Sequence, residues 1–142
     1  MTSLNEIVMA DDICFSRGDV DASVRHYEFP MSLLTPCNEI TITSEEEGAD
    51  MLRRLIAENA AAGVERIETR IVSSVVHLDS VAMVTAEKTR IGPDGARKGN
   101  YLSTYAGHRS PDGWKITALA IDDRGWRKDG RCHHTSFVKD KS

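Results

Sequence analysis

An aspartate stands in the N-terminal segment where helical spacing directs it toward the protein interior. Apolar residues at this spacing predict an amphipathic helix over roughly residues 4–17, and Asp11 belongs to the same stripe. A carboxylate on such a stripe costs free energy unless it is paired, hydrated or facing a cavity. Asp11 is therefore either at the edge of a slightly rotated helix or a pocket carboxylate suited to proton transfer.

A histidine near the end of the chain is the second candidate for chemistry. Residues 101–122 alternate on both sides of Ser110-Pro111-Asp112-Gly113, a turn sequence, and predict a long hairpin. If Arg109 opposes Lys115, His108 opposes Ile116 and shares a face with Trp114, whereas a one-residue bulge would reverse this. His108 is then either a hydrogen-bonded rim residue or a proton carrier.

These two residues, Asp11 and His108, are the predicted catalytic pair if the protein is an enzyme. The predicted lining of the pocket is largely apolar and consists of Phe15, Tyr27, Leu34, Met83, Trp114, Ile116 and Ala118.

No metal or cofactor site is predicted. Cys132-His133-His134 resembles a ligand cluster, but adjacent side chains on an extended tail diverge, and no fourth ligand lies at a usual spacing. The sequence also lacks a glycine-rich phosphate loop, a serine-hydrolase elbow and an HExxH helix.

The predicted elements define an α+β fold. A short second helix follows Gly18 and ends near Tyr27, and short strands follow at 31–35 and 39–43. Ser44 and Glu47 form a capping box for a third helix that Gly63 ends. Long strands at 64–78 and 81–91 join the hairpin in an antiparallel meander. The order predicts a cone-shaped, curved antiparallel sheet wrapped around three N-terminal helices.

The 142 residues fit one domain at 1–123 with a basic tail at 124–142. The chain has net charge −4, of which the tail carries +4, so the body is acidic and nucleic acid is not an expected partner. No apolar run is long enough to span a membrane, and the N-terminus lacks secretory features. Three widely spaced cysteines argue against a disulfide framework and favour a cytoplasmic location.

The order of these elements and their turns resemble the nuclear transport factor 2-like superfamily, and within it the SnoaL-like and ketosteroid-isomerase-like group. The matching features are Arg17-Gly18-Asp19, Tyr27 before Pro30, Leu78-Asp79-Ser80-Val81-Ala82 and Asp112-Gly113-Trp114-Lys115-Ile116. Together they cover about residues 4–123, and the resemblance implies a cystatin-like α+β barrel.

The resemblance leaves the activity open, because the group contains both enzymes and binding domains. The isomerase base corresponds to Thr35 here, and the oxyanion-donating tyrosine corresponds to Asp11, which argues against the familiar isomerase mechanism. SnoaL-like cyclases use a late acid with a nearby histidine, which Asp122 or Asp123 with His108 or His77 would match.

The sequence is therefore compatible with two functions. The first is a homodimeric module that binds a small hydrophobic molecule without chemistry. The second is a lyase, isomerase or cyclase that acts on a polyketide- or steroid-like substrate by general acid–base catalysis. A cavity lined only by carbon would exclude the second. The dimer interface is expected on the sheet face that carries Tyr101, Tyr105, Leu119 and Ile121, if that face is convex.

Overall fold

The computed structural model describes residues 3–122, 127–128 and 131–132. Its helices are α1 (Leu4–Ser16), α2 (Val20–Val24) and α3 (Glu45–Ala61). Its strands are β1 (Tyr27–Leu34), β2 (Glu39–Ile42), β3 (Arg66–His77), β4 (Val81–Ile91), β5 (Arg97–Ser110), β6 (Gly113–Asp122), β7 (Arg127–Lys128) and β8 (Arg131–Cys132).

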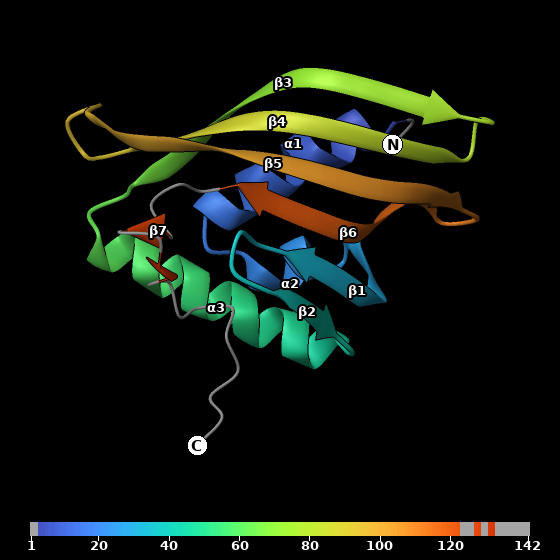
Figure 1. Cartoon of the computed structure of the whole chain (residues 1–142), viewed down its shortest axis with the longest axis horizontal. Helices are drawn as coiled ribbons and strands as arrows, with labels where there is room; N and C mark the ends of the chain where they lie inside the picture. The colour runs from blue at the N-terminus through green and yellow to red at the C-terminus, as the bar shows by residue number, and fades with distance from the viewer. Residues whose placement is uncertain (1–2, 123–126, 129–130, 133–142) are drawn as a thin grey trace.

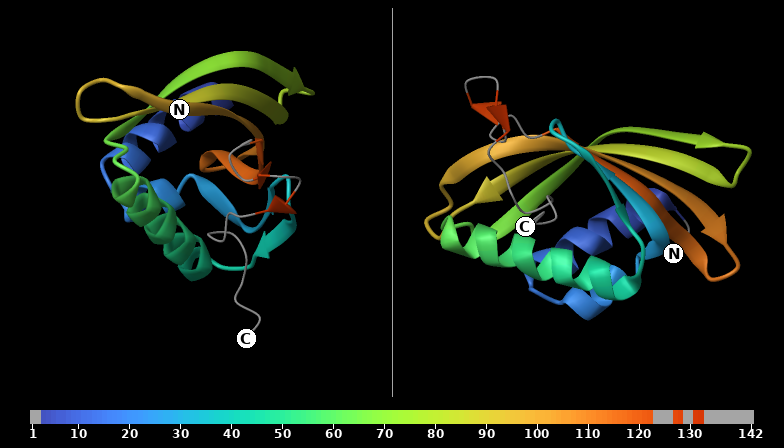
Figure 2. Two further views of the ribbon diagram at one scale, coloured as in Figure 1. Left: turned by 60° about the vertical axis from the view of Figure 1, so that its left-hand side comes forward. Right: turned by 60° about the horizontal axis from the view of Figure 1, so that its bottom comes forward.

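The main sheet has six strands in the order β2-β1-β6-β5-β4-β3 and bends around the helices (Figures 1 and 2). This arrangement confirms the predicted α+β cone. One detail differs, because β1 pairs with β6 in parallel, so the sheet is mixed rather than antiparallel. β7 and β8 form a separate pair. The other residues of the predicted tail, and the side chains of Cys132-His133-His134, lie outside the described part of the chain.

The helix ends form as their sequences predict. Ser44 Oγ accepts a hydrogen bond from Glu47 N at 3.2 Å, as in the predicted capping box. The Glu47 carboxylate reaches one residue further back than expected and accepts from Thr43 N at 2.7 Å. Gly18 has a φ of 72°, as expected for a glycine that ends a helix.

A β-bulge in β6, where it pairs with β5, changes the face of the sheet to which the side chains of half of β6 point. His108 pairs with Lys115 and Gly107 with Ile116, but Ala106 pairs with Ala118, so Thr117 is the extra residue. Trp114 and Ile116 therefore share the inner face with Leu119 and Ile121. The expectation that Ala118 continues their face is wrong, as is the pairing of His108 with Ile116.

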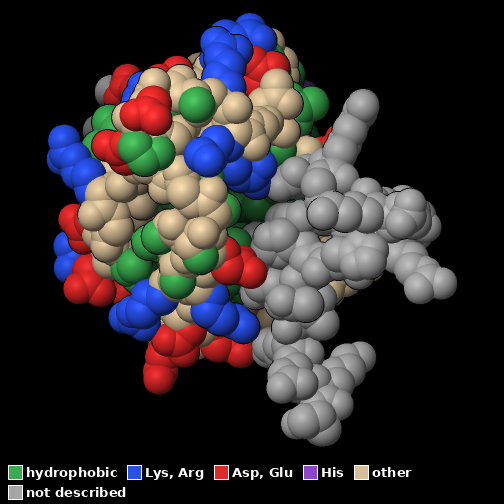
Figure 3. Space-filling model, turned by 90° about the vertical axis from the view of Figure 1, so that its left-hand side faces the viewer, with side chains coloured by type: hydrophobic (Ala, Val, Ile, Leu, Met, Phe, Trp, Pro, Cys, Tyr) green, Lys and Arg blue, Asp and Glu red, His purple; other side chains and the backbone are tan. Residues whose placement is uncertain are grey.

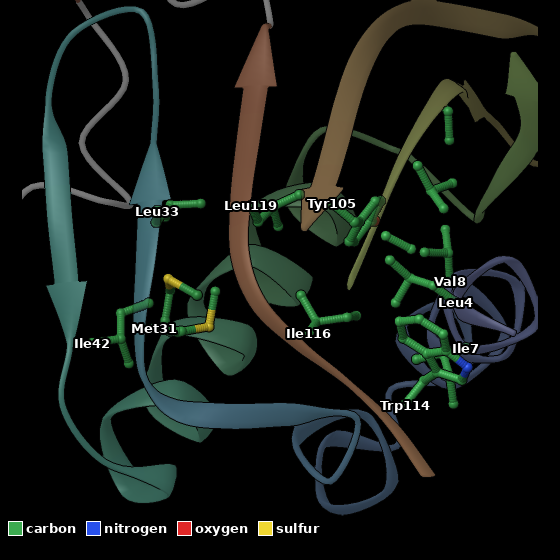
Figure 4. Packing of buried hydrophobic residues seen from close by; sticks show 14 residues of the cluster. Leu4, Ile7, Val8, Met31, Leu33, Ile42, Tyr105, Trp114, Ile116 and Leu119 are labelled. Atoms are coloured by element: carbon green, nitrogen blue, oxygen red, sulfur yellow. The ribbon is translucent and has the colours of Figure 1, made fainter. Parts of the chain in front are cut away.

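The core lies between α1, α3 and the inner face of the sheet (Figure 4). Leu4, Ile7 and Val8 of α1 pack near Trp114, and Met31 lies near Ile42.

Cys14 is a free thiol, whereas Cys37 is disulfide-bonded, which the odd number and wide spacing of the cysteines did not predict. Within the described residues, no helix has the length and apolar character needed to cross a membrane.

The turn between β3 and β4 gives the first testable prediction. Leu78 and Asp79 have φ values of 50° and 58°, and the Leu78 side chain is 95% exposed. A leucine in the left-handed region is strained, whereas asparagine tolerates it. We expect Leu78→Asn to raise the free energy of unfolding by about 1 kcal/mol in urea denaturation. The control Asp79→Ala should lower it, and a stabilising Asp79→Ala would contradict this explanation.

Candidate functional site

A cavity of about 70 Å³ lies inside the cone, between α1, α3 and the sheet. Its apolar lining comes from Phe15, Met31, Leu33, Met51, Leu52, Leu55, Leu119 and Ile121. Its polar lining comes from Asp11, Asp12, Tyr27, Lys88, Tyr101, Ser103 and Tyr105. The cavity thus combines an apolar body with several titratable groups, and it is not lined only by carbon.

A buried ion pair forms one part of the polar wall. Lys88 of β4 is 2% exposed, and its Nζ donates to both carboxylate oxygens of Asp12 at 2.5 Å and to Tyr105 Oη at 2.6 Å. These three bonds use all three protons of the ammonium group. Thr69 Oγ1 also donates to Asp12, and the Lys88 ammonium lies 4.9 Å from the centroid of the Tyr105 ring. The cluster connects α1 to β3, β4 and β5.

Burial opposes both charges of this pair. It raises the pKa of Asp12 and lowers the pKa of Lys88, although each group attracts the other and favours its charged form. The loss of hydration therefore outweighs the mutual attraction. This balance is usual for buried ion pairs, which contribute little to net stability but are costly to break.

Asp11 organises the second part of the polar wall. Its side chain is buried, and Oδ1 accepts from Ser23 Oγ at 2.7 Å and lies 3.0 Å from His26 Nδ1. Its Oδ2 accepts from Tyr27 Oη at 2.8 Å. A carboxylate can accept about four hydrogen bonds, so three of them account for most of its capacity. Asp11 is therefore held in place by α2 and β1.

The structure brings together three of the residues predicted to form the site. Asp11, Phe15 and Tyr27 line the cavity. Trp114 and Ile116 are buried in the core beside α1 and do not line it. Leu34 and Met83 are exposed, and Ala118 lies beyond the bulge and points to the outer face. Their placement follows from the bulge at Thr117 and from the alternation of β1 and β4.

His108 lies away from the cavity. It follows the bulge, its side chain is 40% exposed, and its Nε2 bonds to the Glu28 carboxylate. It therefore does not meet Asp11. His77, the other histidine considered, is exposed at the end of β3, and Asp122 is exposed at the end of β6. Asp123 lies outside the described residues.

Sequence reasoning missed Asp12, Lys88 and Tyr105 as site residues. Lys88 could have been found, because Ala82, Val84, Ala86 and Lys88 alternate along one strand and all are buried. A lysine in such a buried series needs a carboxylate partner. Asp12 had a weaker signal, because it follows Asp11 on the helix and could equally have pointed to solvent.

A second hollow lies elsewhere on the surface, between the end of α1, the end of α3 and the start of β3, with a volume of about 230 Å³. Its polar lining includes Arg17, Asn59, Glu65 and Arg66, which offers no matched acid–base pair. Over the part of the chain that is described, no group of three or more His, Cys, Asp or Glu residues could hold a metal ion.

The buried tyrosines predict a loss of stability at high pH. Burial, followed by nearby aspartates, raises the pKa of both Tyr27 and Tyr105 well above 10. Between pH 10 and the folded-state pKa, the unfolded chain loses these phenolic protons and the folded chain keeps them, so stability falls as pH rises. We expect a decrease of about 2 kcal/mol between pH 10 and 11 from the two residues.

Urea denaturation at pH 9, 10 and 11 measures this decrease, and Tyr27→Phe is the control that should remove about half of it. Tyr27 and Tyr105 should contribute no phenolate absorbance to the folded protein at pH 11 if the explanation is correct. Ionisation of all three tyrosines before unfolding would contradict it.

Solved structures similar to this chain share its fold. An NTF-2 like protein of unknown function from Shewanella oneidensis aligns with a TM-score of 0.69 and 16% identity, over 84% of this chain and 96% of that one. A ketosteroid isomerase-like protein from Erwinia carotovora atroseptica aligns with a TM-score of 0.63 and 17% identity, over 84% and 92%.

An NTF2-like protein with a cystatin-like fold from Novosphingobium aromaticivorans gives a TM-score of 0.65 and 12% identity, over 94% of this chain and 85% of that one. At these identities the similarity establishes the fold alone. No curated protein sequence matches the chain. The model of one family, described as NTF2-like protein (DUF6841), matches residues 11–124. With its fold and most of its length matched, this chain belongs to the NTF2-like family DUF6841.

Proposed function

We propose that the cavity binds a small, mostly apolar molecule with one polar group that lies against the tyrosine hydroxyls. The observation that carries this proposal is that the cavity wall has one polar part and one apolar part. Tyr27, Tyr105 and Lys88 lie among its polar residues, and leucine, isoleucine, methionine and phenylalanine form its apolar part. Sites for small molecules usually have this composition, with a few placed polar groups in an apolar pocket.

The volume limits the size of the ligand. About 70 Å³ is roughly the share of liquid volume of two water molecules, whereas pockets for drug-sized ligands have ~300 Å³ or more. A steroid or polyketide would fit only by its end, or after the cavity widens. We therefore propose a ligand, or an inserted end of one, of only a few carbon atoms.

The test is an NMR titration of the ¹⁵N-labelled protein with butanone and 2-butanol. Binding should shift the amide signals of Leu33, Ser103 and Leu119, which line the cavity. Leu55→Trp should abolish these shifts, because Leu55 lines the cavity and the larger ring would fill it. Leu34→Trp is the matched control, since Leu34 is exposed outside the cavity. Unchanged cavity signals at saturating probe would refute the proposal.

Acid–base catalysis is a second candidate, and one observation favours it. The cavity has two carboxylates on its wall, each bonded to a different set of proton donors, so an acid and a base could act on one bound molecule. We propose Asp11 as the proton acceptor, acting through Tyr27. In an isomerase or lyase assay, Asp11→Asn should lower kcat by about 10²-fold.

His108→Gln separates this arrangement from one that uses His108. Because His108 bonds to Glu28 and does not line the cavity, its substitution should change kcat less than threefold, as expected of a surface site. A loss of about 10²-fold in His108→Gln would instead place the proton transfer at the rim of the sheet.

We also propose that the outer face of the sheet pairs with a second copy of the chain. Val75, Met83, Ala106 and Ala118 are cross-strand neighbours on this face, and Val75 and Met83 are about half exposed. Tyr101 and Tyr105, which the sequence predicts at the interface, line the cavity instead. The face seen in Figure 3, by contrast, mixes hydrophobic side chains with charges of both signs.

Sedimentation equilibrium tests whether the protein forms a dimer through this face. Met83→Glu places a charge within the apolar row and should convert a dimer into a monomer. Ala57→Glu, on the exposed surface of α3, is the control and should leave the dimer intact. A monomeric unaltered protein at micromolar concentration would contradict the proposal.

A further inference from the structure

The two buried tyrosines of the cavity have hydrogen bonds of opposite direction. Lysine can only donate, so the bond from Lys88 Nζ makes the Tyr105 oxygen an acceptor. The proton of the Tyr105 hydroxyl is not used in that bond. Within the described residues, no acceptor takes this proton. Tyr105 is therefore a donor available to a molecule in the cavity.

Tyr27 has the reverse arrangement. Its hydroxyl donates to Asp11 Oδ2 at 2.8 Å, so its proton is already used and its oxygen can still accept. Asp11 is fixed by Ser23 and His26, which prevents it from turning away from Tyr27. The two tyrosines therefore offer a ligand one donor and one acceptor at separate places on the wall.

Charge behind each hydroxyl strengthens this difference. The Lys88 ammonium polarises the Tyr105 O–H bond and makes its proton a better donor, and the Asp11 carboxylate makes the Tyr27 oxygen a better acceptor. Both phenols keep their protons at neutral pH, because their pKa values are raised by burial and by the aspartates. Tyr105 thus remains a hydrogen-bond donor, and Tyr27 an acceptor, at neutral pH.

The same residues disfavour charged ligands. Asp11, Asp12 and Lys88 together give the wall one net negative charge, which opposes an anion. An ammonium ligand would find at most one of about four acceptor positions left on each aspartate, because each already has three hydrogen-bonded contacts. A buried charge without a partner is costly.

We infer that the ligand is a small neutral carbonyl compound whose oxygen accepts the Tyr105 proton. This inference rests on the proposed function, since it names the chemical class of molecule held in the same cavity. A carbonyl oxygen only accepts, so it matches Tyr105 and finds no partner in the Tyr27 oxygen. An alcohol can use either tyrosine.

Three probes of similar size test the inference: butanone, 2-butanol and the 2-butylammonium ion. Each is titrated into the unaltered protein, Tyr105→Phe and Tyr27→Phe, and the dissociation constant is read from the cavity amides. Butanone should bind at least tenfold more tightly than the ammonium ion. Tyr105→Phe should weaken butanone roughly five- to tenfold, the loss of one hydrogen bond, and Tyr27→Phe less than twofold.

The outcomes separate this inference from the proposed function. If 2-butanol binds but butanone does not, or if Tyr27→Phe weakens butanone as much as Tyr105→Phe, the carbonyl inference is wrong and the binding function stands. Tightest binding of the ammonium ion also overturns the inference. If no probe shifts the cavity amides, both fail.

A second measurement needs no variant, in case Tyr105→Phe fails to fold. The C=O stretch of bound butanone should lie at lower frequency than in an alkane solvent, because a donated hydrogen bond weakens the carbonyl bond. An alkane-like frequency for the bound ketone would overturn the inference.

Discussion

Replacing Lys88 by methionine is expected to lower the free energy of unfolding by about 3–5 kcal/mol, since it leaves a buried carboxylate unpaired. Lys88 donates to both Asp12 oxygens and to Tyr105, and the pair is buried among α1, β3, β4 and β5. Urea denaturation measures the loss. It should be smaller at low pH, where Asp12, whose pKa is raised by burial, takes up a proton.

The double variant Asp12→Leu with Lys88→Met is the matched control. Burial works against both charges, so an apolar pair of similar volume should recover at least half of the stability lost in Lys88→Met alone. A single variant that costs less than about 1 kcal/mol would contradict a buried pair in this place. A double variant less stable than either single variant would contradict the claim that hydration loss dominates.

Replacing Asp11 by leucine is expected to cost about 3–5 kcal/mol of stability. The substitution removes the acceptor of Ser23 Oγ, Tyr27 Oη and the His26 ring. Ser23 is buried and Tyr27 is partly buried, and each unsatisfied buried donor costs about 1–3 kcal/mol. Urea denaturation measures this loss as well.

Asp11→Asn is the control for Asp11→Leu. The amide keeps one acceptor oxygen and nearly the same volume, so its cost should be about 1–2 kcal/mol. Equal effects of the two variants would show that the charge of Asp11, rather than its hydrogen bonds, stabilises the fold. An effect below about 0.5 kcal/mol in Asp11→Leu would place Asp11 on the surface.

The sequence predicts the elements of this fold well because their signals are local. Ser44 with Glu47 starts α3, Gly18 ends the first helix, and the Ser110–Gly113 turn closes the last hairpin, all of them through contacts a few residues apart. The parallel pairing of β1 with β6 was not predicted, because it joins segments far apart in the chain and leaves no local pattern.

The candidate site was predicted less completely, and one residue explains much of the difference. The bulge at Thr117 keeps Trp114 and Ile116 on the face of Leu119, whereas strict alternation gives Ala118 that place. The predicted shared face of Tyr105 and Leu119 holds, but it is the inner face of the sheet. Tyr101 and Tyr105, which were expected at the dimer interface, line the cavity. His108, which was expected in the pocket, lies at the rim of the sheet.

Asp11 was predicted as a candidate because a charge on an apolar stripe is unusual in any register. Its partners Ser23 and His26 could not be predicted, because they come within hydrogen-bond distance of Asp11 only when α2 packs against α1. Lys88 and Asp12 likewise meet only when the sheet bends over the helix. Local patterns thus identify a residue that needs a partner, and the tertiary fold supplies that partner.

The most direct test of a cavity that binds a small polar-ended molecule is a crystal structure of the protein soaked in butanone. We expect density for the ketone inside the cone, among Leu33, Leu119 and Tyr105, with its oxygen within hydrogen-bond distance of the Tyr105 hydroxyl. Ketone density found only in the surface hollow beside Arg17 and Glu65, with the cone unchanged, would contradict it.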